Sequence, residues 1–148
     1  MPTLQWNAYS AAVNYLTTEL NSLANGGWAL SGLVNNSVNL RVYSDIDVVL
    51  SAAVTAGSGN PTLDLYLIPA PDGTNSANPP GGAAGAVPVT YFIGAIAANA
   101  SASFTRGTLR GIILPPGYFR IALQNNLGAA LPATGNTATG YEYTEQSV

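Results

Sequence analysis

The residues of this chain that could do chemistry are few, and most of them are carboxylates. Asp45 and Asp47 lie two residues apart and would share one face of an extended strand, the minimum for the acid and base of a glycoside hydrolase. With Asp64 and Asp72 they could instead offer oxygen ligands to a calcium ion. Neither interpretation is favoured, because such spacing is common on exposed strands and residues 45–47 lack the Gly and distal Glu of a helical calcium loop.

The amino-acid composition excludes most other catalytic mechanisms. The chain has no Cys, no His and no Lys, and its entire basic complement is Arg41, Arg106, Arg110 and Arg120. A His general base, a Cys or Lys nucleophile, a Schiff base and a His/Cys metal centre all need residues that are absent. We therefore expect a protein that is not an enzyme, with no catalytic residues, no cofactor and no metal.

The charge pattern bears on partners. Four Arg are scattered among seven acids, for a net charge of -3, so we expect no nucleic acid partner, which would require a basic patch. Charged residues make up only 7% of the chain, against about 25% in ordinary soluble domains. The surface must then be largely neutral, which suits a protein packed into an assembly.

Residues 1–6 lack the basic and apolar regions of a signal peptide, which indicates synthesis in the cytoplasm.

A membrane span is the alternative for the longest uncharged stretch, between Asp72 and Arg106. Its first half is a Pro/Gly/Ala/Asn loop. Its second half, residues 87–98, is shorter than the ~20 apolar residues that a bilayer requires and is interrupted by Pro88 and Thr90. A buried strand is the better interpretation, and we expect no membrane partner.

The elements that position these residues begin with a predicted helix. Thr3 could cap it, and Asn25-Gly26-Gly27 supplies a stop. We therefore predict an amphipathic helix and Gly hinge over residues 1–27, followed by a separate domain over residues 28–148. The apolar residues recur at helical spacing: Trp6, Tyr9, Val13, Leu16, Leu20 and Leu23.

After the hinge the apolar period changes to two. About eight short strands separated by turn clusters predict a β-sandwich, jelly roll or barrel, and no helix-length segment lies between them to support a parallel α/β sheet. The predicted strands fall at 28–30, 33–34, 38–42, 46–50, 63–67, 87–93, around 104, 109–114, 118–123 and 141–143.

Two segments carry a family resemblance. Residues 63–75 (LDLYLIPAPDGTN) and 114–128 (LPPGYFRIALQNNLG) resemble strand-turn blocks of small virion proteins of tailed bacteriophages, above all the capsid decoration or cement proteins. Together with the predicted N-terminal helix and the strand at residues 135–143, the likeness spans most of the chain. It implies a jelly-roll fold that assembles, often as a homotrimer, on the outside of the head and binds the major capsid protein. It supplies no catalytic residues.

The prediction is thus a jelly-roll β-sandwich that acts as a virion structural protein on the capsid surface. Aromatic and apolar side chains near the two ends of the chain are the candidate assembly interface, because aromatic anchors dominate many interfaces: Trp6, Tyr9, Val13, Leu16, Tyr141 and Tyr143. The alternative is a carbohydrate- or receptor-binding module of a tail fibre or spike, for which Tyr91 and Tyr118 would serve.

Overall fold

The computed structural model describes residues 3–76 and 89–147, and within them the chain is mainly β. Two single-turn 3-10 helices, η1 (Thr18–Leu20) and η2 (Val89–Tyr91), are the helical elements of these described residues. The strands are β1 (Leu4–Trp6), β2 (Val13–Leu16), β3 (Trp28–Leu30), β4 (Val34–Asn35), β5 (Tyr43–Thr55), β6 (Thr62–Ala70), β7 (Phe92–Ala97), β8 (Ser103–Ile113), β9 (Tyr118–Asn126), β10 (Thr137–Tyr143) and β11 (Glu145–Ser147).

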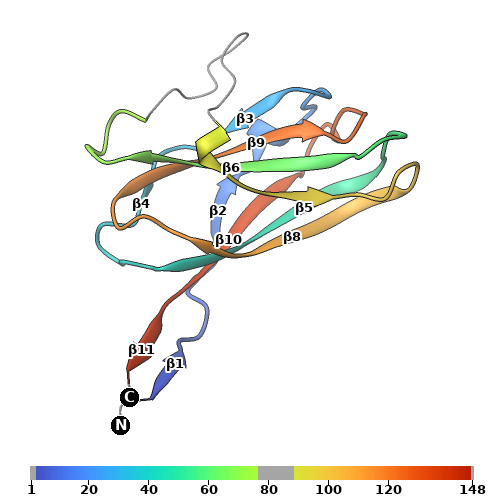
Figure 1. The fold of residues 1–148 in the computed structure, drawn as a ribbon. Helices are drawn as coiled ribbons and strands as arrows, with labels where there is room; N and C mark the ends of the chain where they lie inside the picture. The colour runs from blue at the N-terminus through green and yellow to red at the C-terminus, as the bar shows by residue number, and fades with distance from the viewer. Residues whose placement is uncertain (1–2, 77–88, 148) are drawn as a thin grey trace.

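Two antiparallel sheets face each other (Figure 1). The first and last strands, β1 and β11, pair outside the sheets, and we call this two-stranded ribbon the hairpin although no turn joins its strands. The first sheet has the order β2-β10-β5-β8, and the second has the order β3-β9-β6-β7, with β4 also pairing with β9. The chain passes from one sheet to the other after β2, β4, β5, β7, β8 and β9. Strands that are distant in sequence therefore lie side by side, such as β5 and β10, which pair from Tyr43↔Tyr143 to Val49↔Thr137.

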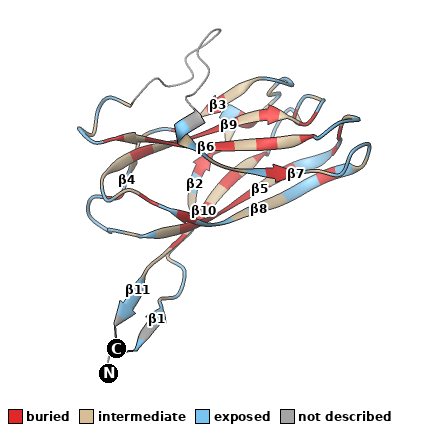
Figure 2. Ribbon diagram, in the orientation of Figure 1, coloured by how far each residue is buried: buried red, intermediate tan, exposed pale blue. Residues whose placement is uncertain are grey.

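The core lies between the two sheets, and the period of two in the sequence explains which residues enter it. Along β6, Leu63, Leu65 and Leu67 are buried while Asp64 and Tyr66 are only partly buried, because successive side chains point to opposite faces (Figure 2). The mainly β architecture predicted from this period is confirmed. The largest fully buried core side chains are Phe119, Leu16, Leu20, Ile46, Leu63, Leu65, Ile121, Leu123, Leu127 and Val48.

The hairpin of β1 and β11 projects from one end of the sandwich (Figure 1). Leu4 pairs with Ser147 and Trp6 with Glu145, so the two ends of the chain run side by side and both termini lie at the tip. β11 follows β10 after a single residue, which makes the hairpin a continuation of the first sheet's central strand.

The predicted N-terminal amphipathic helix is wrong. Residues 13–16 form β2, which pairs with the edge of β10 through Val13↔Gly140 and Leu16↔Ala138. The intervening Asn, Ser and Thr residues are weak helix formers. The open edge of β10 offers backbone partners, and the sandwich offers burial to Leu16 and Leu20, so tertiary pairing outweighs the helical spacing.

The domain boundary predicted at residue 27 is also wrong, because β2 is a strand of the first sheet and Leu20 lies in the core. The Asn25-Gly26-Gly27 segment is not a free joint. Gly26 N donates to Asn125 O, Asn125 N donates to Gly27 O at 3.0 Å, and Gly128 N donates to Asn25 Oδ1 at 2.8 Å.

Two strand predictions need correction. Residues 38–42 form no strand. A turn at residues 37–39 takes their place, because the buried Asn36 side chain donates to Arg41 O and accepts from Arg41 N and so folds the backbone back on itself. Of the predicted strand at 87–93, residues 87 and 88 lie outside the described residues, and β7 begins only at Phe92. In the described part of the chain no helix has the length and apolar character to cross a membrane.

Candidate functional site

Five aromatic side chains gather where the hairpin meets the sandwich, and we call them the terminal aromatic cluster: Trp6, Tyr9, Tyr43, Tyr141 and Tyr143. The last three alternate with inward-facing residues of β5 and β10, so they share the outer face of the first sheet. The first two come from the N-terminal segment, which is held against β10 by hydrogen bonds from Asn7 N to Thr144 O and from Ser10 N to Glu142 O.

The rings contact one another mostly edge to face. Trp6 lies 5.5 Å from Tyr43 and 5.4 Å from Tyr143 between ring centroids, and Tyr9 lies 5.3 Å from Tyr143 and 6.0 Å from Tyr141. Tyr43 and Tyr143, which are directly opposite across two strands, stack at 5.4 Å. Such pairs add to the free energy of burying the ring area, so the cluster holds its exposed members in defined positions.

A buried carboxylate fixes the cluster to the sheet. Asp45 accepts hydrogen bonds from Tyr9 Oη at 2.7 Å, Gly111 N at 2.8 Å and Tyr143 Oη at 3.4 Å. The hydrogen bond to Asp45 raises the pKa of Tyr9 above its ordinary value. Burial raises the pKa of Tyr143, and the negative charge of Asp45 adds to that rise. Both phenols therefore stay protonated and donate to this carboxylate at neutral pH.

The cluster is nevertheless open to solvent. Trp6 is 62% exposed and Tyr9 is 58% exposed, although both have large apolar rings. Between them lies a largely apolar hollow of about 360 Å³, lined by Trp6, Asn7, Ala8, Tyr9 and Tyr143. An exposed, ordered group of aromatic rings around a hollow is a surface suited to receive a partner.

An ion pair borders the cluster on the same sheet face. Arg106 Nη2 lies 2.6 Å from Asp47 Oδ2, and Thr108 Oγ1 donates to Asp47 Oδ1 at 2.9 Å. The Asp47 hydrogen bond raises the pKa of Arg106. Arg and Tyr together are the residues most enriched at binding hot spots.

The structure brings together four of the six predicted interface residues, Trp6, Tyr9, Tyr141 and Tyr143. The other two do not belong to this cluster. Leu16 is 0% exposed in the core and Val13 packs against that core, so the prediction of Leu16 as an interface residue is wrong.

Sequence reasoning missed Tyr43 and Asp45 as members of this surface. The available signal was the alternation along residues 43–50, which places both side chains on the face opposite Ile46 and Val48. The pairing of β5 with β10, which brings them to Tyr141 and Tyr143, follows only from the fold.

The four aspartates weighed for calcium or hydrolysis do not converge. Asp45 and Asp47 are neighbours in β5 but have separate protein donors, as described above. Asp64 Oδ2 accepts from Asn126 Nδ2 at 2.9 Å, and Asp72 closes its own turn by accepting from Thr74 N and Asn75 N. Among the residues that the structure describes, no group of three or more acidic, His or Cys side chains could hold a metal ion.

The two loop aromatics considered for sugar binding lie on the second sheet. Tyr91 in η2 packs against Ile68 and Ala122 on the outer face of that sheet. Tyr118 begins β9, and its ring lies beside Gly73. They do not form one site with the terminal aromatic cluster, which belongs to the first sheet and the hairpin.

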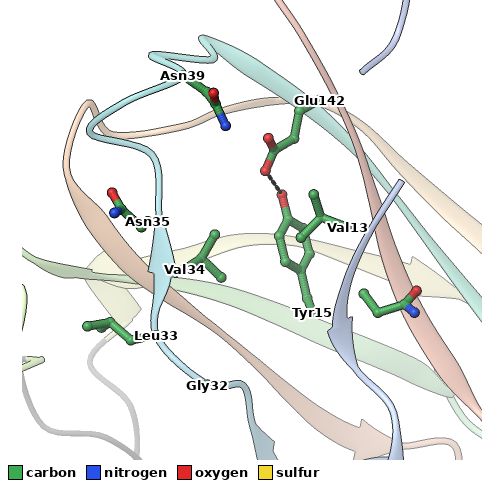
Figure 3. Close-up of a pocket in the computed structure, with 9 residues that line it drawn as sticks. Val13, Tyr15, Gly32, Leu33, Val34, Asn35, Asn39 and Glu142 are labelled. Atoms are coloured by element: carbon green, nitrogen blue, oxygen red, sulfur yellow. Dashed lines mark hydrogen bonds between the residues drawn. The ribbon is translucent and has the colours of Figure 1, made fainter. Parts of the chain in front are cut away.

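A second pocket opens between β2 and β4 at the side of the sandwich (Figure 3). Its volume is about 340 Å³. Figure 3 shows Glu142 and Tyr15 on one side, joined by a hydrogen bond of 2.9 Å from Tyr15 Oη to Glu142 Oε1, and the residues from Gly32 to Asn35 on the other. Burial raises the pKa of Tyr15, which keeps this phenol a hydrogen-bond donor.

No protein-family model matches the chain, and no curated protein resembles it significantly.

Proposed function

We propose that this protein is a non-enzymatic virion structural protein, a cement protein that binds the outside of a tailed-bacteriophage head and stabilises contacts between capsomers. Its partners are then the major capsid protein and further copies of itself, most simply as a homotrimer. The observation that carries the proposal is the terminal aromatic cluster, an ordered set of exposed rings at the base of a projecting hairpin.

The strand order supports assigning the sandwich to the jelly-roll class. With β3 and β4 taken as one interrupted strand and β1 and β11 set aside, the sheet orders become 1-8-3-6 and 2-7-4-5. In that arrangement the first strand pairs with the last, the second with the next to last, and so on inward. This nested pairing produces the two Greek keys of a jelly roll, an architecture that many viral capsid domains use.

The projecting hairpin supports a role in attachment. A two-stranded hairpin with no further strand or helix packed on it is marginally stable in water. Three backbone pairings between β1 and β11 and the contacts of Trp6 hold it here. A partner that covers Trp6 and Tyr9 would bury the exposed rings and complete the packing of the hairpin at the same time.

The scarcity of charge supports a role in a dense assembly. With charged residues at 7% of the chain, neighbouring copies would repel each other little. Burial of apolar surface between copies stabilises the assembly by about 25 cal/mol per Å². This free energy would then have to offset the loss of rigid-body freedom on association, with little added cost from charge repulsion.

The test is binding to heads by matched aromatic variants. Trp6→Ala and Tyr9→Ala should weaken attachment to undecorated heads at least tenfold. Phe92→Ala, an exposed aromatic on β7 of the other sheet at 44% exposure, should attach as the wild-type protein does. A cement protein should also be present in hundreds of copies per purified particle, as measured from stained gels. Wild-type protein that neither co-purifies with heads nor rebinds to them would exclude this function.

A carbohydrate-binding module of a tail fibre or spike is the second candidate, and a specific feature of the second sheet favours it. Trp28, Tyr66 and Phe92 form a row of rings on its outer face, with centroids 5.0 Å and 5.4 Å apart. Asp64 and Asn126 beside them could bond sugar hydroxyls. Binding to bacterial glycans that Trp28→Ala abolishes, with only a few copies per virion, would favour this candidate over the cement protein.

A further inference from the structure

The pocket between β2 and β4 holds a carboxylate in an unusual setting. Glu142 follows the inward-facing Ala138 and Gly140 along β10, so the alternation of the strand directs it between the sheets, and it is only 6% exposed. Among the described residues its side chain has one hydrogen-bond partner, Tyr15 Oη, which donates to Oε1. Tyr15 Oη also lies 3.3 Å from Ser44 Oγ.

In the described part of the chain no arginine lies in an ion pair with this carboxylate. The chain has four Arg and no Lys. The one side-chain ion pair in the described part of the chain joins Arg106 to Asp47 on the other face of the sheet, and no arginine pairs with Glu142. Burying a carboxylate is costly unless it is paired and fully hydrogen-bonded. Glu142 is thus a buried acid with one neutral donor, facing an open pocket (Figure 3).

The rest of the lining combines an apolar wall with amide groups. Val13, Leu33 and Val34 supply the apolar part. Two of the amides are already engaged through their oxygens, since Asn14 Oδ1 accepts from Thr139 Oγ1 at 3.0 Å and Asn35 Oδ1 accepts from Ser37 N at 2.9 Å.

Asn39 completes the lining, and its side chain makes no hydrogen bond within the described residues. In Figure 3 it lies beside Glu142 at the same end of the pocket. The pocket therefore presents a carboxylate and a free carboxamide group next to aliphatic side chains.

We propose that this pocket receives an arginine side chain of a partner protein, with its guanidinium on Glu142 and Asn39 and its methylene stem on Val13 and Val34. A guanidinium has five N–H donors and no acceptor, which matches the Glu142 carboxylate and the carboxamide oxygen of Asn39. Its stem packs on apolar surface while the head group bonds. The pocket, with a volume of about 340 Å³, has room for one arginine side chain. Naming the partner as the capsid protein rests on the proposed function.

The first experiment uses a small probe and does not depend on heads. N-acetyl-arginine methylamide, titrated into 15N-labelled protein, should give saturable shifts at the backbone amides of residues 13–15 and 32–35. The citrulline analogue has nearly the same shape without the charge and should bind at least tenfold more weakly. Glu142→Gln should weaken the arginine probe at least tenfold, while Asp64→Asn, an acid on the outer face of the second sheet, should bind it normally.

A second variant keeps the test valid if Glu142→Gln folds poorly. Gly32 lines the pocket, and an added Cβ would meet no atom within 4 Å. Gly32→Leu should therefore fold normally, leave Glu142 in place and reduce probe binding by narrowing the pocket. No shifts with the arginine probe, or equal binding of the citrulline analogue, would overturn the cation site.

The second experiment addresses the source of the arginine. If wild-type protein attaches to heads, Glu142→Gln and Gly32→Leu should each weaken attachment at least fivefold. Attachment of both variants at wild-type affinity would overturn the capsid protein as the source. Probe binding in a protein that does not attach to heads at all would leave the arginine site standing and refute the cement function instead.

Discussion

The N-terminal segment should divide into a part that holds the fold together and a part that binds a partner. Leu16 in β2 is 0% exposed within the core, whereas Trp6 in β1 is 62% exposed on the hairpin. We predict that Leu16→Ala destabilises the protein without removing its binding surface. Trp6→Ala should remove the surface with little effect on the fold.

The structure sets the size of each effect. Leu16→Ala removes a buried side chain and leaves a cavity. We expect it to lower the free energy of unfolding by about 3 kcal/mol, since buried Leu→Ala changes usually cost about 2–5 kcal/mol. For a chain of this length that lowers the melting temperature by roughly 10 °C. Trp6 loses two edge-to-face contacts while already mostly in water, so its effect on unfolding should be about 1 kcal/mol or less.

Urea unfolding followed by far-ultraviolet circular dichroism measures the first quantity. The midpoint should fall for Leu16→Ala at an unchanged slope, because the same surface is exposed on unfolding. Association is measured by sedimentation of variant protein with heads, at a temperature where Leu16→Ala is still folded. Trp6→Ala should lose about 2 kcal/mol or more of binding free energy if it is an interface anchor.

Two results would refute this reasoning. A Leu16→Ala variant that unfolds within 1 kcal/mol of wild type would show that β2 is not part of the core. A Trp6→Ala variant that attaches to heads with normal affinity would show that the terminal aromatic cluster is not the attachment surface. In the same way, deletion of residues 1–23 should unfold the sandwich, since it removes β2 and Leu20 from the core.

Four further outcomes follow from particular contacts. Asn36→Ala should cost about 2–3 kcal/mol of unfolding free energy, because the buried amide bonds Arg41 N, Arg41 O and Pro115 O, and urea midpoints will show whether it does. Gly140→Ala should cost about 1–3 kcal/mol by pushing its new methyl group into the Tyr15 ring, and a melting temperature equal to wild type would contradict the packing. Burial raises the pKa of Tyr15 above that of an unfolded tyrosine, so its contribution to stability is complete below about pH 10 and is lost as pH rises above that value. The free energy of unfolding, measured from pH 8 to 11.5, should thus fall less steeply with pH for Tyr15→Phe than for wild type. The two slopes should differ by up to about 1.4 kcal/mol per pH unit, the value for one proton. Chelators should leave the melting temperature within a degree or two of its original value, and a large drop would reveal a metal that the dispersed aspartates do not suggest.

Much of the β architecture could be predicted from local pattern. The alternation of Leu63, Leu65 and Leu67 with polar neighbours marks β6, and the same period marks β5 and β9. Each of these strands buries one face, so its apolar residues alternate with polar ones, and this alternation in the sequence indicates an extended backbone. Residues 38–42 also alternate, but one buried amide from Asn36 redirects their backbone, and that contact is not encoded in the period.

The terminal aromatic cluster could be predicted only in part. Aromatic residues near both ends of the chain indicate an interface, and Trp6, Tyr9, Tyr141 and Tyr143 do come together. The error with Leu16 has a physical cause. An apolar stripe is equally consistent with a helix that meets a neighbour and with a strand that enters its own core, and the choice depends on whether an edge is open nearby.

The sequence alone determined which chemistry is absent and where the long core strands β5, β6 and β9 lie, because residue types and their period are local properties. With no Cys, His or Lys and so few charges, the limits on catalysis and the neutral surface hold in any fold. The tertiary structure decided which segments pair. Residues 13–16 pair with the edge of β10, and the pairing of β5 with β10 places Tyr43 and Asp45 next to the hairpin. Glu142 is buried between the two sheets. Those outcomes depend on contacts between residues up to 127 positions apart in the chain, such as Tyr15 and Glu142, which no local pattern specifies.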